Sequence, residues 1–110
     1  MLKTFRRLLV AGLMLVPVAP APSLAQDKEI AVLLPAAGAP YFRLKAYGYE
    51  DEAKALGYRL SIFDAGGFGN LPQQIKQMED AITRKVSAII LVPASAKGTS
   101  RVIEQAAAAG

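Results

Sequence analysis

The sequence predicts an α/β fold in which a parallel sheet carries helices on both faces. Three segments have the composition of strands, and a stretch suited to a helix follows each of them. Strands and helices that alternate at this spacing are joined by right-handed crossovers, so the strands run parallel. The first and third strand segments are apolar without alternation, which is typical of strands covered on both faces.

The first strand–helix unit occupies residues 29–57. Residues 29–35 are the buried-type strand, and Pro40 is suited to the first turn of the helix that follows. Gly57 is expected to end this helix as its C-terminal cap. The apolar residues of the helix recur at spacings of four and three and predict its buried face: Phe42, Ala46, Tyr49, Ala53 and Leu56.

Two more units follow with the same order. Residues 58–63 predict the second strand, 64–70 a glycine-rich loop, and a helix beginning at Asn70 or Leu71 comes next. Residues 88–92 predict the third strand, 94–98 a loop, and 99–109 the last helix. The predicted buried face of the second helix is Leu71, Ile75, Met78 and Ile82, and its glutamines Gln73, Gln74 and Gln77 are interpreted as surface residues.

Residues 1–25 have the layout of a secretory signal peptide. Lys3, Arg6 and Arg7 precede an apolar run over residues 8–16, and small residues end at Ala25, so cleavage is predicted between Ala25 and Gln26. An uncleaved anchor is the alternative, but the run is shorter than the roughly 20 residues that span a bilayer. The mature chain, residues 26–110, is therefore expected not to be embedded in a membrane.

Composition excludes several function classes for this segment. Of the 13 basic residues, three lie in residues 1–25, where there is no acid, which leaves 10 against 9 acidic residues and a net charge of +1. This balance gives no support to nucleic-acid binding. The chain has no Cys, His or Trp. Metal sites and nucleophile–base pairs therefore lack their usual side chains, and we expect no metal, no cofactor and no catalytic residue.

The candidate site lies where the predicted strands end, because ligands of open α/β sheets bind outside the carboxyl ends of the strands. Tyr41 and Phe42 follow the first strand, and aromatic faces pack against sugars or hold methylammonium groups. The alternative is that both rings face the core at the start of the helix. Ser95, in the loop after the third strand, either donates to a ligand or helps Thr99 to cap the last helix.

The glycine-rich loop at residues 64–70 has two interpretations. It either cradles a phosphate or forms a turn that requires positive φ angles. A nucleotide site needs its G-x-G-x-x-G pattern after the first strand, where this chain has only Gly38. The turn is the favoured interpretation.

Residues 28–110 resemble the first, Rossmann-like lobe of type I periplasmic binding proteins of the ribose/galactose-binding class. The matching segments, in the same order and spacing, include residues 30–35, 39–42, 56–57, 74–75, 79–80, 86–90 and 92–93. Residues 64–70 and 74–77 are most similar to the TorT-type branch, although Phe42 stands where that branch often has Trp. The resemblance implies an aromatic ligand wall at Tyr41 and Phe42. The predicted ligand-binding residues are Ala39, Tyr41, Phe42 and Ser95.

The resemblance also implies a function and a longer protein. We expect residues 26–110 to be the N-terminal part of a two-lobed protein in the periplasm that captures a small polar solute, either a sugar or a small methylamine. The implied partner is the membrane permease of an ABC importer or, as for the namesake of the TorT-type branch, which senses trimethylamine N-oxide, the periplasmic domain of a sensor kinase. Two alternatives remain open: a repressor core of the same fold, and an exported α/β enzyme whose catalytic residues lie beyond Gly110.

Overall fold

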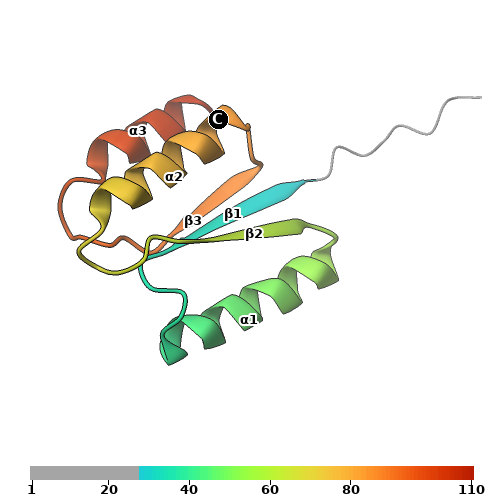
Figure 1. Ribbon diagram of the computed structural model, residues 1–110. Helices are drawn as coiled ribbons and strands as arrows, with labels where there is room; N and C mark the ends of the chain where they lie inside the picture. The colour runs from blue at the N-terminus through green and yellow to red at the C-terminus, as the bar shows by residue number, and fades with distance from the viewer. Residues whose placement is uncertain (1–27) are drawn as a thin grey trace, which may run out of the picture.

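The computed structural model describes residues 28–110 and confirms the alternation of strands and helices (Figure 1). The predicted signal peptide and its cleavage site lie outside the described residues. The elements, in chain order, are β1 (Glu29–Leu34), α1 (Pro40–Leu56), β2 (Arg59–Asp64), α2 (Leu71–Thr83), β3 (Ala88–Leu91) and α3 (Ser100–Ala108).

The three strands form a parallel sheet in the order β2-β1-β3. Val32 in the central strand pairs with Ile62 on one side and with Ile90 on the other. The chain moves outward from β1 to β2 and then crosses back to β3, so the strand order reverses between β1 and β3. Loops separate at such a switch point, which leaves room for a ligand at the carboxyl ends of the strands.

Helices cover both faces of the sheet, as predicted: α1 lies on one face, and α2 and α3 lie on the other (Figure 1). The central strand β1 supplies both halves of the core with residues of 0% exposure. Ala31 and Leu33 pack with Met78 of α2, whereas Val32 and Leu34 pack with Phe42 of α1. A strand that buries both of its faces needs apolar residues at successive positions, which explains the absence of alternation.

The predicted helix ends and faces are partly correct. Gly57 does cap α1 in the left-handed conformation, with φ 75. Leu56, in contrast, is 62% exposed, so the buried stripe of α1 ends at Ala53.

The predicted buried face of α2 is confirmed in part, since Met78 is buried and Ile75 and Ile82 pack against the same core cluster. The surface interpretation of Gln74 and Gln77 is wrong. Ile75 and Ile82 are only half-buried, while Gln74 and Gln77 are buried. The two amides are buried because they hydrogen-bond to backbone groups at the ends of the strands. A buried polar group is tolerated when it is paired in this way.

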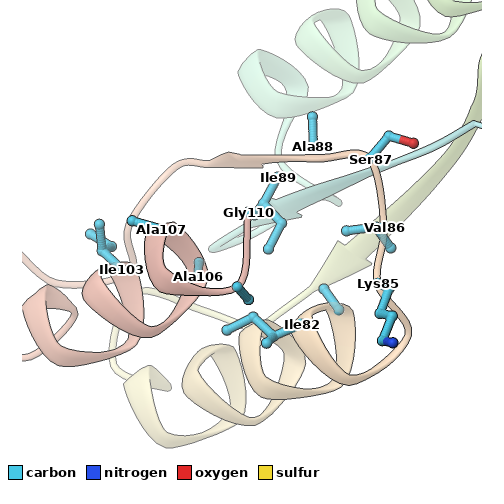
Figure 2. A pocket seen from close by; sticks show the side chains of 12 residues that line it. Ile82, Lys85, Val86, Ser87, Ala88, Ile89, Ile103, Ala106, Ala107 and Gly110 are labelled. Carbon is cyan, nitrogen blue, oxygen red and sulfur yellow. The ribbon is translucent and has the colours of Figure 1, made fainter.

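One edge of the sheet borders an apolar groove. β3 pairs with β1 along one edge only, and beside it lies a hollow of about 850 Å³ between β3, α2 and α3 (Figure 2). The groove lining is mostly apolar and includes Ala81, Ile82, Val86, Ile89, Ile103 and Ala106. Such an edge offers unpaired N–H and C=O groups next to exposed apolar surface.

A polypeptide of residues 26–110 is expected to self-associate or aggregate when it is produced alone. The groove beside the free edge of β3 is a source of exposed apolar surface, and Ile103 within the groove is 46% exposed. Light scattering coupled to size-exclusion chromatography measures the association. Ile103→Lys should reduce it, whereas Arg101→Lys, an exposed change on the same helix, should not. A monodisperse monomer with a cooperative thermal transition would contradict this prediction.

Candidate ligand-binding site

Two of the three loops at the carboxyl edge of the sheet are fastened to each other. The Asp64 carboxylate at the end of β2 accepts hydrogen bonds from the backbone N–H of Ala37, at 3.1 Å, and of Gly66, at 2.9 Å. The N–H of Gly67 donates to the carbonyl oxygen of Pro35, at 2.6 Å. The loops that follow β1 and β2 therefore form one connected surface.

The glycine-rich loop at residues 64–70 forms a turn with positive φ angles, as predicted from the sequence. Gly66 and Gly67 have φ values of 85 and 141, in the region that side chains other than glycine disfavour. Their N–H groups donate to Asp64 and Pro35 within the protein. Because these two donors already have partners, the loop does not present them to a phosphate.

The third loop is held by α2. The side chain of Gln74 donates from Nε2 to the Val92 carbonyl oxygen at 2.9 Å and accepts from the Ala94 N–H at 2.6 Å. Ser95 is half-buried, and its Oγ accepts from the Lys97 N–H at 3.3 Å. The predicted capping alternative is not seen for Thr99, which occupies the N-cap position of α3 without a side-chain hydrogen bond to the helix.

Three aromatic rings gather where α1 begins, and we call Tyr41, Phe42 and Phe68 the aromatic rim. The centroids of the Tyr41 and Phe42 rings are 5.1 Å apart in an edge-to-face arrangement, and those of Phe42 and Phe68 are 5.9 Å apart. Phe42 is buried, with 6% exposure, whereas Tyr41 and Phe68 are 62% and 59% exposed. The rim thus combines one anchored ring with two rings that solvent reaches.

The predicted site residues differ in how they are placed. Ala39 is half-buried and precedes the first turn of α1. Phe42 packs against Val32 and Leu34, which supports the core-facing alternative for this ring. Tyr41, by its exposure, is available to a ligand. Ser95 lies at the same edge but on the third loop. The binding roles of all four residues stay predictions.

Phe68 was missed by sequence reasoning. A large aromatic side chain inside a run of glycines has no packing partner within its own segment, and that is the signal that could have identified it. In the structure the ring lies against Phe42 rather than against the sheet. An exposed aromatic residue held by another ring is typical of an apolar contact surface.

One cationic side chain lies close to the exposed ring of Tyr41. The ammonium group of Lys45 lies 5.3 Å from the centroid of the Tyr41 ring, within the range of a cation–π interaction. Residues 28–110 contain no group of three His, Cys, Asp or Glu side chains that could hold a metal ion. Within the same residues, no helix is long and apolar enough to cross a membrane.

The apolar groove beside β3 is not this site. It borders Ser87 and Ala88, at the beginning of β3, whereas the aromatic rim and the three loops lie where the strands end. Its lining offers few polar groups, and a polar solute needs such groups to fix its orientation. The groove is therefore suited to contact with polypeptide rather than to capture of a solute.

The chain belongs to the family of periplasmic binding protein domains, whose model matches residues 30–110. This agrees with the resemblance to type I periplasmic binding proteins and with the doubly covered parallel sheet. Because the family model spans almost all of the described residues, the membership applies to the fold as a whole and not to one motif.

Several known proteins are similar to this chain. The D-apiose import binding protein of Actinobacillus succinogenes is 33% identical over 86 residues, which are 78% of this chain and 27% of that protein. Another similar protein is a solute-binding protein of an ABC transporter from Bradyrhizobium sp. BTAi1, solved with bound bis-tris. It is 31% identical with a TM-score of 0.71, and the match covers 76% of this chain and 25% of that one.

A third relative is the periplasmic binding protein component of the arabinose ABC transporter from Shewanella sp. ANA-3, solved with L-arabinofuranose. It is 25% identical with a TM-score of 0.67, and the match covers 74% of this chain and 26% of that one. The chain therefore spans about a quarter of the length of these relatives. All three are described as binding proteins and none as an enzyme, in agreement with the expectation of a binding role.

Proposed function

We propose that this chain forms part of a periplasmic solute-binding protein that captures a small sugar for an ABC importer. The observation that carries the proposal is the aromatic rim at the carboxyl edge of the sheet, beside the switch point between β1 and β3. Aromatic faces bind the C–H-rich faces of sugars, while neighbouring backbone and hydroxyl groups meet the sugar oxygens.

The names of two relatives support a sugar of five carbons. One relative is a D-apiose import binding protein, and another was solved with L-arabinofuranose. Both are compact polyhydroxylated rings, small enough to lie against one or two aromatic side chains. Ser95 and the backbone groups of the three loops supply polar partners of the kind that such a ring requires.

A methylamine ligand is the second candidate. It is supported by the similarity of residues 64–70 and 74–77 to the TorT-type branch and by the presence of three rings in the rim. Lys45 argues against it, because its ammonium group lies near the face of Tyr41 that a cationic ligand would use. The positive trimethylammonium end of such a ligand would have to displace Lys45 from this ring or tolerate its charge. The neutral sugar meets no such repulsion.

The partner follows from the ligand. A sugar-binding protein of this family delivers its solute to the permease of an importer, whereas a methylamine-binding protein of the TorT type reports to a sensor kinase. Export by the predicted signal peptide, with cleavage after Ala25, would place the protein in the periplasm for either role. N-terminal sequencing of the exported protein would detect that cleavage.

Truncation of Tyr41 is expected to weaken sugar binding by about 1–3 kcal/mol, since it removes an aromatic contact that becomes desolvated in the complex. Calorimetric titration of the full-length protein with D-apiose, L-arabinose and trimethylamine N-oxide measures the affinities of the unaltered protein and of Tyr41→Ala. Tyr47→Ala is the matched control, because Tyr47 is 73% exposed on the same helix and outside the rim.

The titrations separate the candidates. Binding of either sugar, weakened in Tyr41→Ala and unchanged in Tyr47→Ala, supports the proposed function. Binding of trimethylamine N-oxide alone would replace the sugar by the methylamine candidate. Sugar affinity that is equal in all three proteins would move the site away from the rim.

A further inference from the structure

Gln74 makes an unusual pair of contacts for a residue in the first turn of an amphipathic helix. Its side chain is completely buried. One end of the amide donates to the carbonyl oxygen of Val92, and the other accepts from the N–H of Ala94. Both partners lie just beyond β3, which ends at Leu91, at the beginning of the loop that carries Ser95.

These two bonds reproduce the pairing of a parallel strand. In a parallel ladder, one residue of a strand accepts from and donates to two residues of its neighbour that are two positions apart. The Gln74 amide does the same with residues 92 and 94, while the Val92 N–H donates to the Leu33 carbonyl of β1 at 3.0 Å. The side chain thereby continues the pairing where the regular ladder of β3 has ended.

The next turn of α2 makes a comparable contact with β2. Nε2 of Gln77 donates to the carbonyl oxygen of Asp64, the last residue of β2, at 2.8 Å. Its Oε1 is buried and has no hydrogen-bond partner among the described residues. Gln74 is therefore the more completely paired of the two glutamines, because both ends of its amide have hydrogen-bond partners.

We propose that Gln74 is a positioning residue of the ligand-binding site, which fixes the 93–98 loop in the conformation that presents Ser95 to the ligand. This inference rests on the proposed function for its consequence in binding, but the holding of the loop can be tested without a ligand. No apolar side chain of similar size can replace the amide, because the Ala94 N–H and the Val92 carbonyl would remain buried without partners.

Loss of the amide should loosen the loop more than it loosens the fold. Backbone groups that lose a buried partner regain hydrogen bonds by turning toward water, and both groups here lie beyond the end of β3. The fraction of molecules with an ordered loop then falls, and the apparent affinity falls with that fraction. A purely structural role would instead lower the melting temperature and leave the affinity of the folded protein unchanged.

Hydrogen exchange of the full-length protein tests the holding of the loop. In Gln74→Met we expect the protection factor of the Ala94 amide to fall by about tenfold or more, the equivalent of one net hydrogen bond. Two variants serve as controls. Gln73→Met changes an exposed glutamine of the same helix. Met78→Ala removes core packing from α2 without touching the loop and should lower the melting temperature without a comparable change at Ala94.

Gln74→Glu supplies a signature that core packing alone would not produce. A carboxyl group buried at this position has a raised pKa, and its neutral form donates and accepts as the amide does. Its ionised form has no proton for the Val92 carbonyl and is repelled by that oxygen. The protection of Ala94 in Gln74→Glu should therefore approach that of the unaltered protein at low pH and decline as pH rises.

Titration with D-apiose and L-arabinose completes the test. An affinity that falls by about tenfold or more in folded Gln74→Met, and that recovers in Gln74→Glu at low pH, supports the positioning role. Unchanged protection at Ala94 would overturn the proposal, and so would reduced protection with unchanged sugar affinity. If the unaltered protein binds neither sugar, the proposed function fails for these ligands, while the exchange data still decide whether Gln74 holds the loop.

Discussion

Replacement of Phe42 by alanine is expected to lower the free energy of unfolding by about 3–5 kcal/mol. The ring is 6% exposed and packs with Val32 and Leu34, which are themselves completely buried. Alanine would leave a cavity between α1 and the sheet that rigid neighbours on β1 cannot fill. Phe42 also supports Phe68, so its loss should loosen the aromatic rim as well as the core.

Chemical denaturation of the full-length protein measures this change. Phe42→Leu keeps most of the apolar contact and should cost less, by an amount in the range of about 1–2 kcal/mol. Tyr41→Ala is the matched control, since the Tyr41 ring lies next to Phe42 but is 62% exposed and should contribute little to folding. A Phe42→Ala variant as stable as Tyr41→Ala would show that the α1 side of the core does not depend on this ring.

The fold could be predicted because its determinants are local and repeated. Each strand was found within one residue of its observed ends, since a doubly buried strand needs successive apolar residues and glycine or proline flanks it. The capping role of Gly57 followed from glycine's access to the left-handed conformation. The parallel arrangement followed from the alternation of elements alone.

The fine structure of the site could not be predicted, because it depends on contacts distant in sequence. The partners of Gln74 are backbone groups 18 and 20 positions away, and nothing in the residue types of Val92 or Ala94 identifies them. Periodicity correctly placed Ile75 and Ile82 on the face of α2 that packs against the core, but it left Gln74 and Gln77 on the surface. Hydrogen bonds to backbone groups distant in sequence bury these two glutamines as well, since a paired amide can be buried as fully as an apolar side chain.

The buried acid at the beginning of β1 is a second feature that sequence reasoning passed over. Glu29 was interpreted only as the first residue of a strand, yet its carboxylate accepts hydrogen bonds from Ser61 at 2.6 Å, from Arg59 at 3.0 Å and from Arg84 at 3.0 Å. Arg84 also pairs with Asp80 at 3.0 Å. These contacts join β1, β2 and the end of α2 at the edge of the sheet opposite the site.

Removal of this carboxylate in Glu29→Ala is expected to lower the free energy of unfolding by about 2–3 kcal/mol. The Glu29 side chain is only 9% exposed, so its hydrogen bonds are largely shielded from water. Most of the effect should come from Ser61 and Arg84, because Arg59 is 59% exposed and its ion pair is screened by solvent. Glu52→Ala, at an exposed position of α1, is the control and should change stability little.

The same contacts predict that stability depends on acid pH. The hydrogen bond from Ser61 lowers the pKa of Glu29 below 4.5, and the charges of Arg84 and Arg59 add to this effect against the opposing effect of burial. Because the folded protein then binds the proton less well than the unfolded chain, the contribution of Glu29 is fully present above pH 4.5 and is lost as pH falls through the lowered pKa. Denaturation at pH 7 and at pH 3 measures this loss. The difference between the unaltered protein and Glu29→Ala should shrink at the lower pH, and a difference that stays constant would mean that the carboxylate contributes nothing through its charge.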